Sequence, residues 1–162
     1  MSFVLISNNK EDLIIIPNEA IRVRVIANSN DSYDIKIKEL LKKDINKSVE
    51  KILENVSSID IAREKINKNI KNIHNIVEKR LKELNYYKDF NINYGLNYFP
   101  EKEFKGVKYK DGYYESLVIT LGEGSGPNYW CVLYPPLCLI DDTKINKEYR
   151  LFIKDIIDKY MS

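Results

Sequence analysis

Hydrophobic and polar residues alternate near the start of the chain and then recur at helical spacing. Over residues 21–25, one Ile and two Val are separated by two arginines. This period of two predicts a half-buried strand that extends to about residue 28. The polar run at residues 28–31 predicts a turn, and its Asn, Ser and Asp residues are of the type that caps a helix.

Two long apolar stripes follow at spacings of three and four residues, the pattern of amphipathic helices. The first covers residues 37–56, the second covers 59–84, and two serines separate them. The second stripe repeats about every eleven residues, which keeps it nearly straight along the helix. We therefore expect both helices to pack on a sheet or on each other, and not in a coiled-coil dimer. A further stripe predicts a terminal helix over residues 143–160.

The period of two returns in the second half of the chain. Residues 90–98 alternate apolar and polar positions, and Phe99-Pro100 ends that predicted strand. A lysine- and tyrosine-rich stretch then leads to a turn at Asp111-Gly112. Two more strands are predicted over residues 116–121 and 128–134.

This order of elements predicts an α+β fold: a mostly antiparallel sheet of about four strands, with a long two-helix hairpin packed on one face and a C-terminal helix, forming a two-layer sandwich. The strand after the hairpin should lie antiparallel beside the first strand, and the last two should add as a meander. The opposite face would carry Arg22, Arg24, Asn91, Asn93 and Thr120. We expect that face to be wet or covered by polar loops.

Composition fits one soluble globular domain. The chain has 162 residues, of which 44% are hydrophobic and 31% charged, and that balance excludes a disordered chain. We assign residues 1–19 to an N-terminal lead-in and residues 20–162 to the domain. The apolar run at residues 3–6 fits the end of a trimmed export segment, but it is far short of the roughly 20 residues that span a bilayer.

The net charge of +2 is too balanced to predict nucleic-acid binding, which needs a local excess of basic groups. The chain has a single histidine and two cysteines. A structural zinc site usually needs four nitrogen or sulfur ligands, so we predict no metal site. No pair of carboxylates is placed for acid–base catalysis.

Residues 122–138 hold the densest concentration of unusual residues in the chain. Three glycines in five positions allow a tight turn, but a proline and a strand follow them instead of a helix. Because a phosphate site needs a helix to begin directly after the glycines, we interpret them as a turn between strands. Tyr129 and Trp130 are neighbours in a strand and so point to opposite faces. One of them can anchor a partner, since both residue types are enriched at binding hot spots.

The two cysteines leave three alternatives open. A catalytic cysteine would need His74, the single imidazole in the chain, as its base. A disulfide between Cys131 and Cys138 would require the chain to double back, and Pro135-Pro136 offers a rigid bend for that. The third alternative is a pair of buried thiols that act as small apolar side chains.

Several blocks of the sequence together carry a resemblance to a known family. They are residues 21–29 (Ile-Arg-Val-Arg-Val-Ile-Ala-Asn-Ser), 94–100 (Tyr-Gly through Phe-Pro), 114–117 (Tyr-Glu-Ser-Leu), 122–124 (Gly-Glu-Gly) and 128–138 (Asn-Tyr-Trp-Cys-Val-Leu-Tyr-Pro-Pro-Leu-Cys). A chain with these blocks resembles the stage II sporulation protein R family of endospore-forming Firmicutes.

The resemblance implies a signalling protein that is made in the forespore and exported into the space between the forespore and mother-cell membranes. Its expected partner is the membrane-embedded aspartic protease of the mother cell, which processes the precursor of the early mother-cell sigma factor. The resemblance implies an activator and not an enzyme, with no cofactor and no catalytic residues to carry over. Export also favours the disulfide between Cys131 and Cys138.

We place the candidate contact surface within and beside the last block. Its residues are Arg24, Glu123, Gly124, Asn128, Tyr129, Trp130, Pro135 and Pro136. Two rival hypotheses remain from the residues alone. One is a cysteine-dependent hydrolase that uses Cys131 or Cys138, and the other is a module that binds nucleic acid or an anionic cell-wall polymer through the lysine-rich helices.

Overall fold

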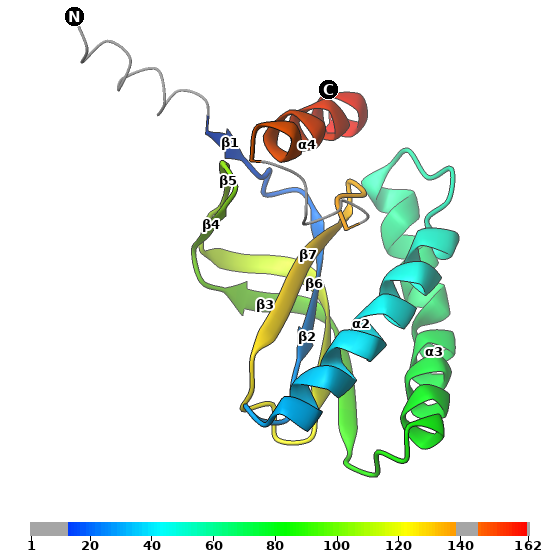
Figure 1. Ribbon diagram of the computed structural model, residues 1–162. Coiled ribbons are helices and arrows are strands. Elements are labelled where there is room, and N and C mark those ends of the chain that lie inside the picture. Colours follow the sequence, from blue (N-terminus) through cyan, green and yellow to red (C-terminus); the bar gives the residue numbers. More distant parts are fainter. Residues whose placement is uncertain (1–12, 139–145, 162) are drawn as a thin grey trace, which may run out of the picture.

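A four-stranded sheet covered on one face by two long helices forms the body of the protein (Figure 1). The computed structural model describes residues 13–138 and 146–161. The helices form a hairpin, and the strands lie in the order β3-β6-β2-β7. The bounds are α2 (Ser32–Ile52), α3 (Ile59–Glu83), β2 (Ile21–Ile26), β3 (Phe90–Phe99), β6 (Gly112–Leu121) and β7 (Asn128–Tyr134).

A second, smaller sheet lies beyond the uncovered side of the main one. It has the order β1-β5-β4, and the C-terminal helix α4 contacts β1. These elements are β1 (Ile14–Ile15), β4 (Lys102–Phe104), β5 (Val107–Tyr109) and α4 (Asn146–Met161). The β4–β5 hairpin is made by the lysine- and tyrosine-rich stretch for which the sequence analysis predicted no strand. Residues 143–145 of the predicted terminal helix and residues 1–12 of the lead-in fall outside the described residues.

The α+β class, the two-helix hairpin and the C-terminal helix are confirmed, but the predicted meander is wrong. Strand β6 lies between β3 and β2 and runs parallel to β2, while β7 pairs with the other side of β2. The cause is visible in the burial of the strands. Most of β6 is buried on both faces, whereas β3 alternates between exposed and half-buried residues. A strand that is apolar on both faces gains most in the centre of a sheet, so β6 displaces β3 from the predicted place beside β2.

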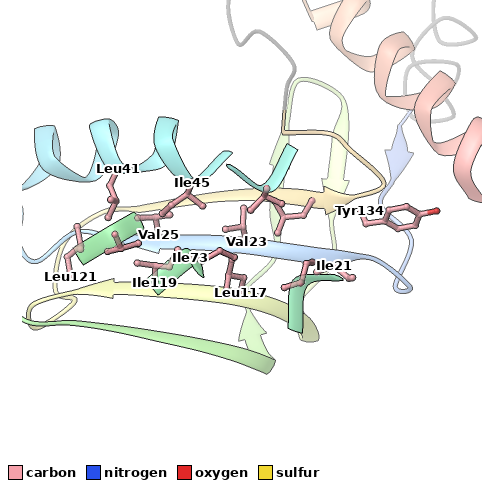
Figure 2. Packing of buried hydrophobic residues seen from close by; sticks show 14 of the residues in the cluster. Ile21, Val23, Val25, Leu41, Ile45, Ile73, Leu117, Ile119, Leu121 and Tyr134 are labelled. Atoms are coloured by element: carbon pink, nitrogen blue, oxygen red, sulfur yellow. The ribbon is translucent and has the colours of Figure 1, made fainter. Parts of the chain in front are cut away.

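The main core lies between the sheet and the helix hairpin (Figure 2). Val23 and Leu117 are opposite each other in the β2–β6 ladder, and both are fully buried. Leu41 and Ile45 from α2 and Ile73 from α3 meet that face of the sheet. Burying each such side chain contributes about 1.5–3 kcal/mol, so this interface is the main source of stability for the hairpin and the sheet.

A salt bridge fastens α3 to the sheet. Arg63 donates two hydrogen bonds of 2.8 Å to the carboxylate of Glu115 in β6. Tyr94 in β3 donates a third to the same carboxylate. Burial acts to raise the pKa of Glu115, but the hydrogen bonds from Arg63 and Tyr94 outweigh it and hold the pKa below its usual value. The charged form of Glu115 is thus the one that joins three elements.

On the opposite face of the sheet, aromatic rings cover Arg22. At this position the prediction of a face that is wet or covered by polar loops is wrong. Arg22 is 2% exposed, and its guanidinium lies 3.6 Å from the ring centre of Tyr114. Phe99 and Tyr109 complete this cage at 5.3 and 5.7 Å. Tyr109 belongs to β5, so the unpredicted small sheet supplies part of the cover.

The caged guanidinium generates a stability prediction. Its three nitrogens have no hydrogen-bond partner in the described residues, and a buried unpaired cation costs several kcal/mol, of which cation–π contacts return about 2 kcal/mol. Arg22→Met keeps an apolar stem against the rings and should leave the free energy of unfolding unchanged or raise it by up to about 2 kcal/mol. Arg22→Ala should lower it by about 2–4 kcal/mol, because it leaves a cavity.

Urea denaturation at pH 7 of wild type and both variants measures this difference. A loss of more than about 2 kcal/mol in Arg22→Met would show that the guanidinium is better solvated than its contacts indicate.

Candidate functional site

The glycine segment is a turn from β6 into β7 that packs against the end of β2. Gly126 donates to the carbonyl of Ala27 at 2.9 Å, and Ser125 donates to the carbonyl of Asn28 at 3.0 Å. A Cβ at position 126 would lie 2.2 Å from the carbonyl oxygen of Ser29. Only glycine permits so close an approach of two backbones. Strand β7 follows the turn, so the predicted turn between strands is present where the sequence placed it.

A buried carboxylate, Asp34, holds this turn in place from the first turn of α2. It accepts hydrogen bonds from Ser29 Oγ at 2.5 Å, from Asn28 Nδ2 at 2.8 Å and from Tyr86 OH at 2.8 Å. The other side-chain atom of Asn28, Oδ1, accepts from the backbone N–H of Glu123 at 2.9 Å. One carboxylate thus connects β2, α2, the residues after α3 and the glycine turn.

Local structure at the end of α3 brings Tyr86 to that carboxylate. Asn85 has a positive φ of 55° and donates to the carbonyl of Lys82, while Tyr86 donates to the carbonyl of Leu81. These two bonds form a Schellman motif, and asparagine tolerates the left-handed position that the motif requires. The motif turns the chain so that the Tyr86 side chain is buried against α2.

The charge state of this cluster follows from its hydrogen bonds. The bonds from Ser29 and Asn28 hold the pKa of Asp34 below its usual value, against the opposing effect of burial. Burial and the bond to Asp34 raise the pKa of Tyr86.

The prediction that residues 28–31 cap a helix is right in position only. Asp31 is the N-cap residue but makes no side-chain cap bond, and Asn28 and Ser29 bond to the Asp34 side chain instead.

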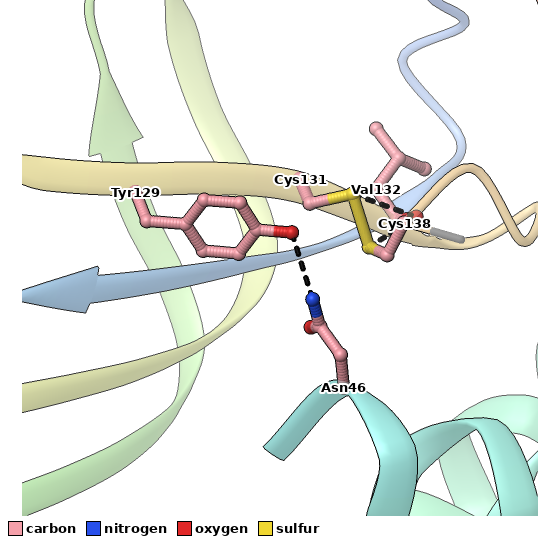
Figure 3. The surroundings of a disulfide bond; sticks show 5 residues. All are labelled: Asn46, Tyr129, Cys131, Val132 and Cys138. Carbon is pink, nitrogen blue, oxygen red and sulfur yellow. Dashed lines mark hydrogen bonds between the residues drawn. A yellow bond between two sulfur atoms is a disulfide. The ribbon is translucent and has the colours of Figure 1, made fainter. Parts of the chain in front are cut away.

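Tyr129 and Trp130 point to opposite faces of the sheet, as predicted. The Tyr129 hydroxyl faces α2 and accepts a hydrogen bond of 2.9 Å from Asn46 Nδ2 (Figure 3). Lys42 Nζ lies 4.6 Å from the centre of the Tyr129 ring. On the other face, Trp130 meets Phe99 edge-to-face at 5.4 Å. Each aromatic is half-buried, so each combines a packing role with an accessible surface.

Arg24 joins the Trp130 side of the site. Its Nε donates to Asn128 Oδ1 at 3.1 Å, and its guanidinium lies 5.7 Å from the ring centre of Trp130. A further bond of 3.3 Å reaches the carbonyl of Tyr98. Burial lowers the pKa of Arg24, which remains charged near neutral pH. The predicted residues Arg24, Asn128 and Trp130 thus form one cluster.

The other predicted residues lie at the two ends of β7. Glu123 is exposed and Gly124 half-buried, and both belong to the glycine turn. Pro135 and Pro136 lie beyond the far end of the strand, where Pro135 is buried. The structure therefore does not bring all the predicted contact residues together. Pro135 acts as part of a bend and not as an accessible contact.

Cys131 and Cys138 form a disulfide, with their Cα atoms 5.4 Å apart (Figure 3). The chain reverses at the prolines, and Leu137 N–H donates to the carbonyl of Val132 at 3.1 Å. Closing so short a loop stabilises by about 2–3 kcal/mol in the chain-entropy model. Because the pairing uses both cysteines of the chain, it leaves no thiolate for the hydrolase hypothesis. His74 lies on α3, half-exposed, with its ring 4.8 Å from that of Phe90.

A groove of about 520 Å³ lies beside β7, between α2 and the small sheet. Lys38 and Lys42 line it from α2, Lys102 and Phe104 from β4, and Trp130 from β7. The helix that forms α2 was predicted, but neither Lys42 nor Lys102 was assigned to the site, because nothing in a single sequence pairs a helix face with a distant hairpin. In the described ranges, no three His, Cys, Asp or Glu side chains gather as metal ligands, and no helix is long and apolar enough to cross a bilayer.

Together the fold and the site define a small α+β domain with an aromatic and basic surface around a disulfide-braced strand. The chain belongs to the stage II sporulation protein R family, whose model matches residues 17–144. It is 34% identical over 128 residues to "Stage II sporulation protein R" of Bacillus subtilis (strain 168). The matched residues make up 79% of this chain and 57% of that relative. The chain thus spans a little over half the length of that relative, and the family to which it belongs is named for sporulation. No solved structure matches it.

The glycine turn generates a second stability prediction. Gly126→Ala should lower the free energy of unfolding by about 2–3 kcal/mol, because two backbones must separate to admit the methyl group. Gly95→Ala is the matched control, since the nearest atom to its added Cβ is a side-chain oxygen 3.9 Å away. That control should be neutral or stabilising by up to about 1 kcal/mol. Thermal or urea unfolding measures both, and equal effects at the two positions would contradict the close packing of the turn.

A third prediction concerns pH. The folded-state pKa of Asp34 is lowered, so its contribution is full above the unfolded value of about 3.9 and is lost as pH falls through the folded-state pKa. Asp34→Asn should lower the free energy of unfolding by about 2–4 kcal/mol at pH 7. The gap between wild type and variant should narrow as the pH falls below about 5.

Urea titrations of both proteins at pH 7, 5 and 3 test this dependence. Using the difference between wild type and variant removes the contributions of other carboxylates such as Glu115. A gap that is constant across that range would show that Asp34 does not titrate with folding.

Proposed function

We propose that this chain is an intercompartmental signalling protein of endospore formation. In this proposal it is exported from the forespore into the space between the forespore and mother-cell membranes. There it binds the extracytoplasmic part of a membrane-embedded aspartic protease of the mother cell and activates it. The protease then processes the precursor of the early mother-cell sigma factor. The chain acts by recognition and performs no catalysis itself.

The observation that carries the proposal is the structural role of residues 128–138, the longest sequence block shared with the family. Both cysteines of residues 128–138 are consumed in a disulfide. Asn128 and Trp130 of the same block form a half-exposed basic and aromatic cluster with Arg24, which lies on the neighbouring strand β2. Trp and Arg are the residue types most enriched at binding hot spots. A structural disulfide also suits an oxidising compartment outside the cytoplasm.

Binding to an anionic polymer through the helix lysines has less support. Lys68 pairs with Glu64 at 2.8 Å and Lys82 with Glu78 at 3.5 Å along α3. Such alternation of charge leaves little local excess of positive potential on α3, and an anionic polymer needs a continuous basic surface.

Glu123→Ala tests the proposed function. The side chain is exposed on the glycine turn, and the turn is held by backbone bonds, so the variant should unfold at the wild-type temperature. Losing one charged contact with the protease should reduce sigma-factor processing by about tenfold or more, since a hydrogen bond to a charged group contributes about 1.5–3 kcal/mol. Processing is measured by immunoblot in cells that produce the protease, the precursor and an exported form of this chain.

Glu64→Ala on α3 is the matched control, because it removes the same carboxylate from an exposed helix face. Cells that export this variant should process the precursor to the same extent as cells that export the wild-type chain. If the wild-type chain itself triggers no processing, the proposed function is wrong. If the protease processes the precursor normally in the presence of Glu123→Ala, the glycine turn is not part of the contact.

A further inference from the structure

Strand β7 is an edge strand of the main sheet, and its ladder with β2 determines which backbone groups face outward. The N–H of Ala27 donates to the carbonyl of Pro127 at 3.0 Å, so these two residues occupy a hydrogen-bonded position of the ladder, although Pro127 has no N–H to return a bond. In an antiparallel pair, bonded and unbonded positions alternate. The backbone N–H and C=O groups of Asn128, Trp130 and Val132 therefore point away from β2.

The disulfide-braced turn covers one end of this edge. Leu137 donates to the outward carbonyl of Val132, in agreement with the alternation, and the bond between Cys131 and Cys138 holds that turn against the strand. For Asn128 and Trp130, the backbone groups on the outer side have no backbone partner within residues 13–138 and 146–161. A short stretch of edge is thus left available between the glycine turn and the brace.

The groove beside this stretch has a definite chemistry. Lysines 38, 42 and 102 line it with a single glutamate, Glu39. Lys42 also lies over the Tyr129 ring and Lys102 lies 5.2 Å from the ring centre of Trp130, one on each side of the strand. The indole Nε1 of Trp130 is buried with no acceptor in the described residues. Glu39 pairs with Lys42 at 2.7 Å and with Lys38 at 3.5 Å, so the three lysines and one glutamate leave the walls with a net positive charge. The outward backbone N–H groups of the strand between the walls are hydrogen-bond donors.

We infer that an extended, acidic peptide segment adds as a strand to the edge of β7 at Asn128–Trp130. Its backbone pairs with the outward groups of these residues, and its carboxylates face Lys42 and Lys102 on the two walls of the groove. Strand addition of this kind gains affinity from main-chain bonds and specificity from side chains on alternate faces. The inference rests on the proposed function, in which the segment belongs to the extracytoplasmic part of the protease.

Asn128→Pro is the direct test of edge pairing. Proline removes the outward N–H and is tolerated on an edge strand whose inner bonds are intact. Asn128→Ala is the matched control, because it removes the same side chain and its bond to Arg24 but keeps the N–H. With the detergent-solubilised protease as the probe, Asn128→Pro should bind about tenfold more weakly than Asn128→Ala. Both variants should keep the wild-type unfolding temperature within a few degrees.

A charge reversal tests the acidic character of the segment. Lys42→Glu should weaken binding by about tenfold, and the loss should shrink as salt is added. Lys79→Glu, on an exposed position of α3 outside the groove, should bind as wild type does. Equal binding by both reversals would overturn the acidic assignment.

Hydrogen exchange on the wild-type chain supplies a readout that needs no variant. The amides of Asn128 and Trp130 should exchange slowly only in the complex, whereas the inward amide of Tyr129 should be protected with or without the protease. If the wild-type chain binds and activates the protease without protection of these two amides, and Asn128→Pro binds as well as Asn128→Ala, the inference is overturned and the proposed function stays intact. A wild-type chain that neither binds nor activates the protease would overturn both.

Discussion

The buried carboxylate of Asp34 is the interaction on which the arrangement around β7 depends. It lies at the first turn of α2 and accepts from Asn28, Ser29 and Tyr86, which come from two segments far apart in sequence. The other side-chain atom of Asn28, Oδ1, accepts a hydrogen bond from the N–H of Glu123 and so positions the glycine turn. A buried charge is tolerated only when its hydrogen-bonding capacity is filled, so all these segments must be placed together. The start of β7 is fixed by that requirement.

The elements could be predicted from the sequence because each depends on local periodicity. The stripes of α2 and α3 and the alternation of β2 and β3 are visible in windows of ten to twenty residues. The order of the strands could not be predicted in that way. Which strand neighbours β2 depends on how much apolar surface each strand has on both faces, and β6 buries Val118 on one face as well as Leu117 and Ile119 on the other.

The site was partly predictable for the same reason. Opposite orientations for Tyr129 and Trp130 follow from the pleat of any strand. The cage around Arg22 and the groove wall at Lys102 depend on the β4–β5 hairpin, whose strands are three residues each. Strands so short leave almost no periodic signal. Asp34 had a signal in the polar residues of the family block at 28–29, but those residues were interpreted as a cap for the helix backbone instead of as donors to a side chain.

The disulfide and the lysines both limit unwanted strand pairing at the exposed edge of β7. An exposed edge invites pairing with any other strand, including the same edge of a second copy. The brace from Cys131 to Cys138 covers one end, which restricts the open stretch to Asn128–Trp130. Lys42 and Lys102 flank that stretch, so a second copy would bring positive groups against positive groups, whereas an acidic strand would not. The same residues that favour one partner therefore disfavour self-association, which makes the edge specific as well as accessible.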